Sequence, residues 1–578
     1  MNSERKSKSI SRPFLILLVL GSVSFCLTIV KSGLIYSYGM GFWGANGHDG
    51  IWHIALINQL AKLRLDHPTF AGERIFNYHF GFDLLVAFFH LLTRIPVINL
   101  YFQFFPPIFA VLIGLLTYRL ILELTRSKSS AFWATFFVYF SGSWGWLISF
   151  LRNRSLGGES MFWANQAVST LINPPYALSL ILFLSGDLLF LKYWERPSVS
   201  RLLITALILG ILIQVKVYAG VIVLGSLFLL SSLSIILNLN KKIEIWQLFF
   251  ACLGISLIVF LPFNSTSGSL LIFLPFWFPH SMLYAQDRFY WPLLANSRQI
   301  YFATKQWLKF LAAELFALFI FIVGNLGTRV IGFVFLLRLW QKKGKFFEFW
   351  LWFFLQTLVS LTIPLIFIQK GNPWNTIQFF YYFQFFLAIL TGLGFGSWLE
   401  QRKHDPRYSN LLKYFGTIFV LLLTVPTTII TLKNDYLPGR PPAKISPQEL
   451  VALDYLRRQP EGVVLTYPFN ADRRDGFSPP KPLYVYETTS YVSAFSQKQT
   501  FLEDEMNLEI SGYDWRTRRK KEEIFFSTND QKWANDFLKE SKIKYIYLIK
   551  GQKMNLKEDN VKAKKIFENG ETVIYQIN

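Results

Sequence analysis

Long apolar runs with almost no charge recur along this chain of 578 residues, and they constrain its fold more than any other feature. Runs such as Trp246–Phe263, Phe347–Ile368 and Leu411–Leu432 hold about twenty residues, the length that a helix needs to cross the hydrocarbon of a bilayer. In hydrocarbon, a helix satisfies all of its own backbone N–H and C=O groups. Since 52% of the residues are hydrophobic and only 16% are charged, the composition is not that of a soluble protein. The sequence therefore predicts a mainly α-helical polytopic membrane protein.

Eleven helical spans are predicted from runs of this kind. A shorter apolar segment, Gly81–Leu92, carries Asp83 and His90, and it fits a helix lying in the membrane interface better than a span. The first predicted span follows a basic N-terminus without a cleavage-site pattern, so we expect it to be retained. The predicted spans are 14–36, 102–118, 131–151, 175–191, 202–217, 219–239, 246–263, 314–337, 347–368, 376–398 and 411–432.

The formal net charge of +22 comes mostly from short loops between the predicted spans, which is typical of an orientation signal and not of a nucleic-acid footprint. Short cytoplasmic loops carry an excess of Lys and Arg. With the N-terminus in the cytoplasm, the dense basic clusters fall on the cytoplasmic side. If 82–96 were counted as a span, these clusters would fall on the outer side instead. Residues 37–101, 152–174 and 264–313 then form outer loops. The cytoplasmic clusters are Arg119/Arg126/Lys128, Lys192/Arg196/Arg201, Lys241/Lys242, Arg338/Lys342/Lys343/Lys345 and Arg402/Lys403/Arg407.

The C-terminal part of the chain has the pattern of a folded domain. Ser446, Pro447 and Glu449 supply an N-cap serine, a first-turn proline and an acid at the third helical position, which predicts the start of a helix. Strand-like runs follow this helix. We therefore expect a transmembrane domain over 1–435 and a small extracytoplasmic α/β domain over 436–578. The strand-like runs are Gly462–Tyr467, Lys544–Ile549 and Thr572–Ile577.

The two cysteines, Cys26 and Cys252, both lie inside apolar runs, so the C-terminal domain has no disulfide framework. Together with the absence of an obvious eukaryotic targeting signal, this favours a bacterial inner (cytoplasmic) membrane as the location. Membrane lipids are then partners of the protein.

The first outer loop concentrates the residues that could do chemistry, because five of the seven histidines fall between His48 and His90. If a helix starts near Asp49, then Asp49 and His53 share one of its faces. A carboxylate at the membrane surface, close to the imidazoles of His48 and His53, can act as a general base. Two other interpretations are open: Asp49 caps the helix while His53 packs in the interface, or Asp49, His53 and His79 hold a divalent metal ion.

Lys216 stands alone in an apolar stretch of nearly forty residues, at the bend of a predicted hairpin. A charge in or near hydrocarbon usually has a partner or a task. A lipid-linked phosphate suits this lysine, although snorkelling to lipid headgroups is the alternative. Amide and aromatic side chains in the outer loops suit sugar hydroxyls and ring faces, and they equally suit interfacial turns. The residues predicted to bind a donor phosphate or sugar are Lys216, His79, Asn77, Asn165, Asn173, Lys370, Asn372 and Trp374.

The layout as a whole resembles the GT-C superfamily of membrane glycosyltransferases, which use polyprenyl-phosphate-linked sugars. The shared features are an acid in the first outer loop, interfacial helices in that loop, about eleven spans and a C-terminal outer domain. The residues that carry the resemblance are His48-Asp49…His53, Asn77-Tyr78-His79 and the loop Asn165–Tyr176. The chain departs from familiar members in having His-Asp in place of paired acids. It also lacks the Trp-Trp-Asp-Tyr-Gly run of oligosaccharyltransferases, which argues against protein N-glycosylation.

The resemblance implies a hexosyl- or pentosyl-type transferase of cell-envelope polysaccharide synthesis. Asp49 would deprotonate the acceptor, and outer basic residues, Lys216 first among them, would bind the donor phosphate. The reaction would be an inverting displacement in which polyprenyl phosphate leaves, so no cofactor is obligatory, although a divalent cation is compatible with it. The implied partners are a polyprenyl-phosphate-linked sugar donor and a lipid, glycan or protein acceptor.

Two other classes of function stay open. The first is a transporter or flippase for a lipid-linked glycan, which would use an intramembrane acid such as Asp187. Transporters usually show internal repeats and paired discontinuous helices, and the sequence shows neither. The second is a non-catalytic assembly factor of envelope glycan synthesis.

Overall fold

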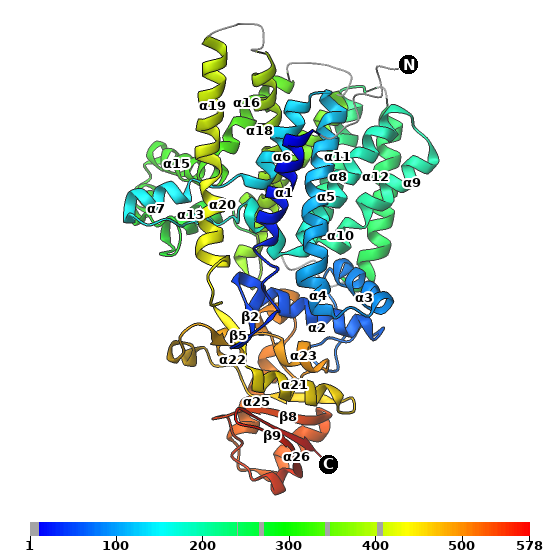
Figure 1. The fold of residues 1–578 in the computed structure, drawn as a ribbon, viewed down its shortest axis with the longest axis vertical. Helices are drawn as coiled ribbons and strands as arrows, with labels where there is room; N and C mark the ends of the chain where they lie inside the picture. The colour runs from blue at the N-terminus through cyan, green and yellow to red at the C-terminus, as the bar shows by residue number, and fades with distance from the viewer. Residues whose placement is uncertain (1–10, 240, 265–270, 341–346, 402–407, 578) are drawn as a thin grey trace. The chain divides into compact units, whose positions relative to one another are not determined.

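The computed structural model describes residues 11–577, except residue 240 and the segments 265–270, 341–346 and 402–407. The chain divides into two compact units (Figure 1). The first unit consists of Met1–Thr28, Pro106–Pro262 and Leu271–Leu437. The second consists of Ile29–Phe105, Phe263–Leu270 and Pro438–Asn578. The long loop after the first helix therefore folds with the C-terminal part of the chain, a grouping that the sequence did not predict.

The first unit is a bundle of helices (Figure 1). Within the described residues, eight helices are long and apolar enough to cross a membrane, or nine if a pair bent by 48° forms one broken span. The helices and strands of this unit are α1 (Arg12–Cys26), α5 (Phe105–Thr125), α6 (Lys128–Phe140), α7 (Gly145–Asn153), α8 (Pro174–Glu195), α9 (Val199–Gly210), α10 (Leu212–Val215), α11 (Val217–Ile236), α12 (Lys242–Phe260), β3 (Leu271–Phe273), α13 (Trp277–Tyr284), α14 (Pro292–Ala303), α15 (Trp307–Leu326), α16 (Ile331–Trp340), α17 (Phe347–Ile366), β4 (Phe367–Gln369), α18 (Ile377–Gln401), α19 (Tyr408–Thr424) and α20 (Pro426–Thr431).

A helix or a helix pair overlaps each of the eleven predicted spans, but three of them differ from the prediction. The first predicted span runs to residue 36, whereas its helix ends at Cys26 and Ile35–Tyr36 form a strand. The expected span 131–151 is the bent pair α6 and α7, because the chain breaks at Ser141–Trp144. The helices at the first and fifth positions, Arg12–Cys26 and Val199–Val215, are shorter than the others. Length and composition thus support eight or nine spans, and the count of eleven stays a prediction.

The predicted orientation also stays a prediction. The N-terminal residues before Ser11, the lysines 342, 343 and 345, and the cluster Arg402/Lys403/Arg407 lie outside the described residues.

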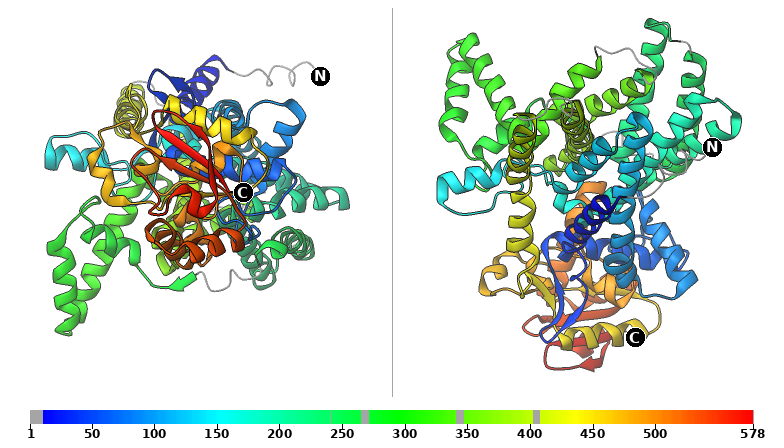
Figure 2. Two further views of the ribbon diagram at one scale, coloured as in Figure 1. Left: turned by 90° about the horizontal axis from the view of Figure 1, so that it is seen from below. Right: turned by 45° about the horizontal axis from the view of Figure 1, so that its top comes forward.

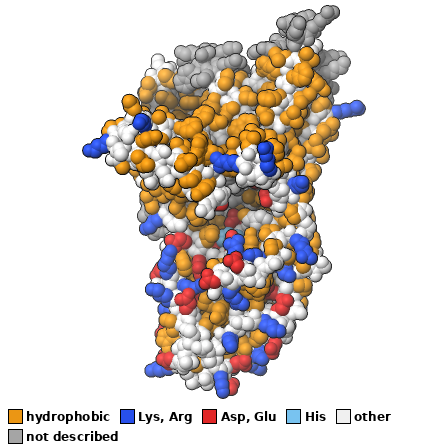
Figure 3. Space-filling view, turned by 90° about the vertical axis from the view of Figure 1, so that its left-hand side faces the viewer, with side chains coloured by type: hydrophobic (Ala, Val, Ile, Leu, Met, Phe, Trp, Pro, Cys, Tyr) orange, Lys and Arg blue, Asp and Glu red, His pale blue; other side chains and the backbone are white. Residues whose placement is uncertain are grey.

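Close helix packing in the first unit depends on small residues, as in other membrane bundles. Helices α6 and α18 meet so closely that a Cβ atom added to Gly392 would lie 2.2 Å from the Cα atom of Ala134. The outward side chains are apolar: Leu311, Leu315 and Phe319 recur every four residues along α15 and are exposed. Figure 3 shows hydrophobic side chains over most of one face of this unit, whereas charges of both signs are scattered over the second unit. Such a surface suits contact with lipid.

The second unit contains a four-stranded sheet with the order β6-β8-β10-β9. Strand β6 (Val463–Thr466) runs parallel to β8 (Ile543–Ile549), while β10 (Thr572–Ile577) runs antiparallel to β8 and to β9 (Ala563–Glu568). Helix α21 (Pro447–Arg458) covers one face of the sheet, and α25 (Trp515–Ser527) and α26 (Gln531–Glu540) cover the other, as the left-hand view of Figure 2 shows. The helix and the three strands predicted for the C-terminal domain are confirmed, and Ser446 accepts the predicted capping hydrogen bond from the Glu449 amide at 3.0 Å.

The first loop joins this unit through backbone hydrogen bonds. Strand β2 (Gly39–Phe42) pairs antiparallel with β5 (Ala443–Ile445), and β5 pairs parallel with β7 (Lys481–Pro482). Thr500 donates to the Pro68 carbonyl at 2.9 Å and accepts from the Ala71 amide at 3.0 Å. The remaining elements of the unit are β1 (Ile35–Tyr36), α2 (Asp49–Ala61), α3 (Gly81–Thr93), α4 (Val97–Asn99), α22 (Leu483–Tyr486), α23 (Tyr491–Ser496) and α24 (Glu505–Ser511).

Candidate active site

The start of α2 holds a partly exposed carboxylate against a buried imidazole. The helix begins at Asp49, as predicted, with His48 as its N-cap residue. The Nδ1 atom of His48 lies 2.9 Å from Oδ1 of Asp49, and its Nε2 atom lies 3.3 Å from Oδ1 of Asp504. The side chain of Asp49 is 45% exposed, whereas His48 and Asp504 are buried. A partly exposed carboxylate, a buried imidazole and a buried carboxylate thus lie in a row.

The electrostatics of this row keep the imidazole charged. Burial opposes the charge of His48, but the carboxylates of Asp504 and Asp49 outweigh burial, so the pKa of His48 is raised well above its ordinary value. The charged ring hydrogen-bonds to Asp49 through Nδ1, while its Nε2 atom makes only a charge contact with Asp504. His48 therefore orients the Asp49 carboxylate, which stays partly exposed. Asp49 also lies in the first turn of α2, where the helix dipole favours a negative charge.

His53 has a carboxylate partner of its own, which is not Asp49. Its Nδ1 atom lies 2.7 Å from Oδ1 of Asp83 on α3, and both side chains are buried. The ring of Tyr101 stacks on the His53 ring with 5.6 Å between centroids. The packing of α3 against α2 thus gives His53 a carboxylate partner in Asp83, and the role expected of His53 beside Asp49 on the same helix stays a prediction.

Asn77 and His79 take part in local packing of the second unit. The side-chain amide of Asn77 donates to the Ser511 carbonyl at 3.0 Å. The ring of His79 stacks on Tyr78, with 4.8 Å between centroids. Among the residues that the structure describes, no three His, Cys, Asp or Glu side chains are placed to hold a metal ion. The hypothetical metal site of Asp49, His53 and His79 is therefore not formed.

Two residues predicted to bind the donor contact each other in the first unit. Lys216 is buried at the junction of α10 and α11, where its extended backbone makes the predicted bend. Its Nζ atom lies 3.4 Å from Oδ1 of Asn173 and 5.6 Å from the ring centroid of Tyr218. Asn173 caps α8 by accepting from the Tyr176 amide at 3.1 Å. The ammonium group is thus held beside an amide and an aromatic ring.

The turn after β4 lies near the same group. Gln369 accepts from the hydroxyl of Tyr218 at 3.5 Å and from the side-chain amide of Asn375 at 2.8 Å. In this turn Asn372 is buried, Lys370 is exposed and Trp374 is 49% exposed. The structure therefore links the turn to Lys216 through Tyr218. Asn165, in the preceding outer loop, is half-buried.

Sequence reasoning missed a buried arginine in the first unit. Arg329 lies in an apolar run, and its guanidinium donates to Gln166 Oε1, to the Asn325 carbonyl at 2.8 Å and to the Leu326 carbonyl at 3.0 Å. The isolated charge is the signal that singled out Lys216, so the same rule applied to residues 314–337 would have found it. Asp504, by contrast, carries only the local signal of the N-cap residue of α24, and nothing near it in the sequence marks its contact with His48.

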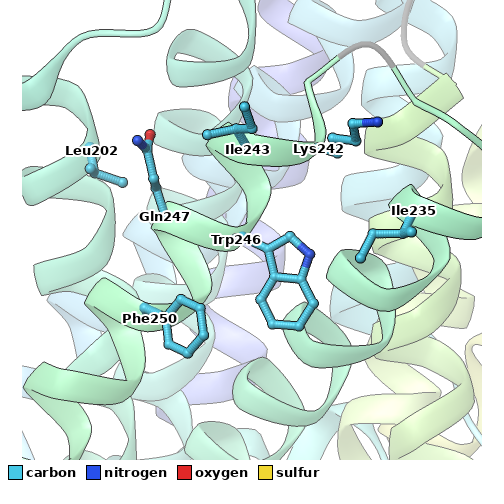
Figure 4. Close-up of a pocket in the computed structure, with 7 residues that line it drawn as sticks. All are labelled: Leu202, Ile235, Lys242, Ile243, Trp246, Gln247 and Phe250. Carbon is cyan, nitrogen blue, oxygen red and sulfur yellow. The ribbon is translucent and has the colours of Figure 1, made fainter.

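A groove on the first unit holds none of the predicted site residues. It opens between α9, α11 and α12 (Figure 4). Because α11 rises about 1.5 Å per residue, Ile235 in this groove lies about 28 Å from Lys216 at the other end of the helix. The groove is therefore separate from the Lys216 group. It is lined by Leu202, Ile235, Lys242, Ile243, Trp246, Gln247 and Phe250.

The described residues form a mainly helical fold with helices long and apolar enough to cross a membrane and with a C-terminal α/β region. This fold is similar to that of a known oligosaccharyltransferase. The similar structures are those of the Archaeoglobus fulgidus oligosaccharyltransferase. One, tethered with an acceptor peptide containing the NVT sequon, has a TM-score of 0.51 and 12% identity, covering 93% of this chain and 69% of that one. Another, in complex with Zn and sulfate, has a TM-score of 0.51 and 14% identity, covering 92% and 68%.

At this level of identity the likeness is one of fold alone. Neither a known protein family nor a curated protein sequence matches the chain.

Proposed function

We propose that this chain is a membrane glycosyltransferase of GT-C type that moves a sugar from a polyprenyl-phosphate donor to an extracytoplasmic acceptor, with Asp49 as the general base. The observation that carries the proposal is the partly exposed Asp49 carboxylate, held by buried His48 in a chain with a GT-C-like fold. A carboxylate fixed in orientation and partly exposed can take a proton from an acceptor hydroxyl.

In the proposed reaction the acceptor oxygen attacks the anomeric carbon of the donor sugar while its proton passes to Asp49. The bond between that carbon and the phosphate oxygen breaks, and polyprenyl phosphate leaves with the electron pair. The configuration of the sugar is inverted. His48 touches neither substrate in this scheme and acts as a positioning residue.

The donor phosphate is assigned to Lys216 and Asn173 of the first unit. A lysine ammonium group stabilises the charge that develops on a leaving phosphate. The amide of Asn173 orients this ammonium group, and Tyr218 contributes an aromatic face. His53 is assigned a structural role, since its burial and its bond to Asp83 account for it.

Asp187, on which the transporter alternative depends, has a structural explanation in the first unit. Its buried carboxylate accepts from the indole N–H of Trp352 at 2.8 Å and from the amide of Gln356 at 3.3 Å. Neutral donors on α17 thus hydrogen-bond to this acid on α8. The transporter interpretation gains no support from it.

The test follows donor consumption by membranes that carry the protein, with a panel of short-chain polyprenyl-phosphate sugars. Asp49→Asn is expected to lower turnover by about 100-fold or more, the usual contribution of a general base. Glu73→Gln is the matched control, because Glu73 is an exposed acid of the same loop. Turnover that survives in Asp49→Asn would remove this residue from the mechanism.

A further inference from the structure

Several acidic side chains line a pocket at the carboxyl ends of the two parallel strands of the second unit. Thr466 ends β6, Tyr547 lies near the end of β8, and Gln552 follows that strand; all three line the pocket. The pocket has a cavity volume of about 50 Å³, room for a small group such as one ammonium. In α/β sheets, ligands bind outside the carboxyl ends of parallel strands. Its place in the fold is therefore that of a ligand site, and we name it the acidic pocket.

The lining of the acidic pocket is dominated by carboxylates. Arg519 is the cation in the lining, and its Nη1 atom lies 2.7 Å from Oε1 of Glu505. Glu503 accepts from the backbone amides of Val492 and Ser493 at 3.1 and 2.9 Å. One carboxylate is thus offset by charge and another by hydrogen bonds. Burial raises the pKa of Glu503 to about 8 and that of Glu522 well above the ordinary carboxyl value, so a bound cation is what would favour their charged forms. The acids that line the pocket are Glu487, Glu503, Asp504, Glu505 and Glu522.

Two buried polar atoms in the lining of the acidic pocket have no hydrogen-bond partner among the residues that the structure describes. The Glu522 side chain is only 1% exposed, and its Oε1 atom is one of the two. Thr489 is buried and also lines the pocket, and its Oγ1 atom likewise has no hydrogen-bond partner among the described residues. Burying polar atoms without partners is unfavourable by several kcal/mol. A ligand that donates hydrogen bonds would satisfy both.

A protonated amine fits this lining better than a metal ion does. The described residues include no group of three acids or histidines placed around one metal position. An ammonium group brings three N–H donors and a positive charge that spread carboxylates can share. The rings of Tyr467, Tyr484 and Tyr491 also line the pocket and suit a cation or the face of a sugar.

We propose that the acidic pocket binds the protonated amine of the acceptor, which is then an amine-bearing small molecule or glycan end such as an amino sugar. Asp504 lines this pocket and also contacts His48, which holds Asp49, so the amine and the proposed base belong to one network. The assignment of the amine to the acceptor rests on the proposed function, whereas its binding in the pocket does not.

Binding is tested first, with the full-length protein in detergent and calorimetric titration. Glucosamine is the probe, and N-acetylglucosamine is its neutral counterpart. Glu522→Gln and Glu487→Gln are each expected to weaken glucosamine binding by about tenfold or more. Asp536→Asn, an exposed acid on α26 outside the pocket, is the matched control and should bind normally. Equal binding of the two sugars, no saturable binding of glucosamine, or unchanged binding in both glutamine variants would overturn the proposal.

Donor turnover then separates the two proposals. If glucosamine binds and raises Asp49-dependent donor consumption, both are supported. If it binds but leaves that consumption unchanged, the acceptor assignment fails while the proposed function stands. If it binds and no donor is ever consumed by the native protein, the proposed function fails while the ammonium site stands.

Discussion

Replacing Asp504 by asparagine removes one of the two carboxylates that hold the His48 imidazole while preserving the shape of the side chain. The atoms Nε2 of His48 and Oδ1 of Asp504 are 3.3 Å apart, and both side chains are buried. At an effective dielectric constant of about 20, two unit charges at this distance attract by about 5 kcal/mol. Because Asp49 still contacts the imidazole, we expect a net loss of about 3 kcal/mol, at the low end for a broken buried pair.

The substitution also predicts a change with pH. The pKa of His48 is raised in the folded protein, so its stabilising contribution is complete below the unfolded value near 6.5 and is lost as pH rises through the folded value. The stability difference between native protein and Asp504→Asn should therefore be larger at about pH 6 than at about pH 9. Thermal unfolding in detergent measures this difference, with Asp536→Asn as the control.

Turnover provides the second readout for Asp504→Asn. If Asp504 positions the base, its replacement by asparagine should lower kcat by about tenfold or more and leave the KM for donor nearly unchanged. Its pH profile should shift, because the pKa of His48 falls when a carboxylate partner is lost. A variant that matches the native protein in stability at both pH values and in kcat would refute the inference that Asp504 organises His48 and Asp49.

Two further predictions concern the first unit. Lys216→Gln should raise the KM for a polyprenyl-phosphate donor by about tenfold or more, since it removes a charge assigned to the phosphate; Lys305→Gln, an exposed lysine before α15, is the control, and an unchanged KM would withdraw that assignment. Gly392→Ala should destabilise the packing of α6 on α18 by about 1–3 kcal/mol, because the added methyl group would lie 2.2 Å from Ala134 Cα. Its control is Gly254→Ala, where a Cβ atom meets nothing within 4 Å; equal melting temperatures for the two variants would contradict this close contact.

Local sequence patterns predicted elements well where a single segment decides the structure. The Ser446 cap and the following helix were predicted because capping depends on four consecutive residues. The break at Lys216 was predicted because one charge interrupts an apolar stretch that is too long for one span. The bend at Ser141–Trp144 was missed, since a run of apolar residues on both sides of it hides the interruption.

The partners of the histidines could not be predicted in the same way. Spacing within one helix suggested Asp49 for His53, but Asp83 on α3 lies 2.7 Å from it. Asp504 lies far along the chain from His48 and shows no pattern that marks it as a partner. Contacts of this kind depend on which elements pack together, so they appear only in the folded unit.

The sequence by itself determined that this chain has a helical membrane part, where its helices lie and where its C-terminal α/β region begins. Hydrocarbon penalises every unsatisfied backbone group, so the length and polarity of each segment are enough to identify a helix that can cross it. Only the tertiary structure decided that the first loop folds with the C-terminal region, that His48 joins Asp49 to Asp504, and that several acids share one pocket. These features join residues from distant segments, and their distances follow from packing, which no local pattern records.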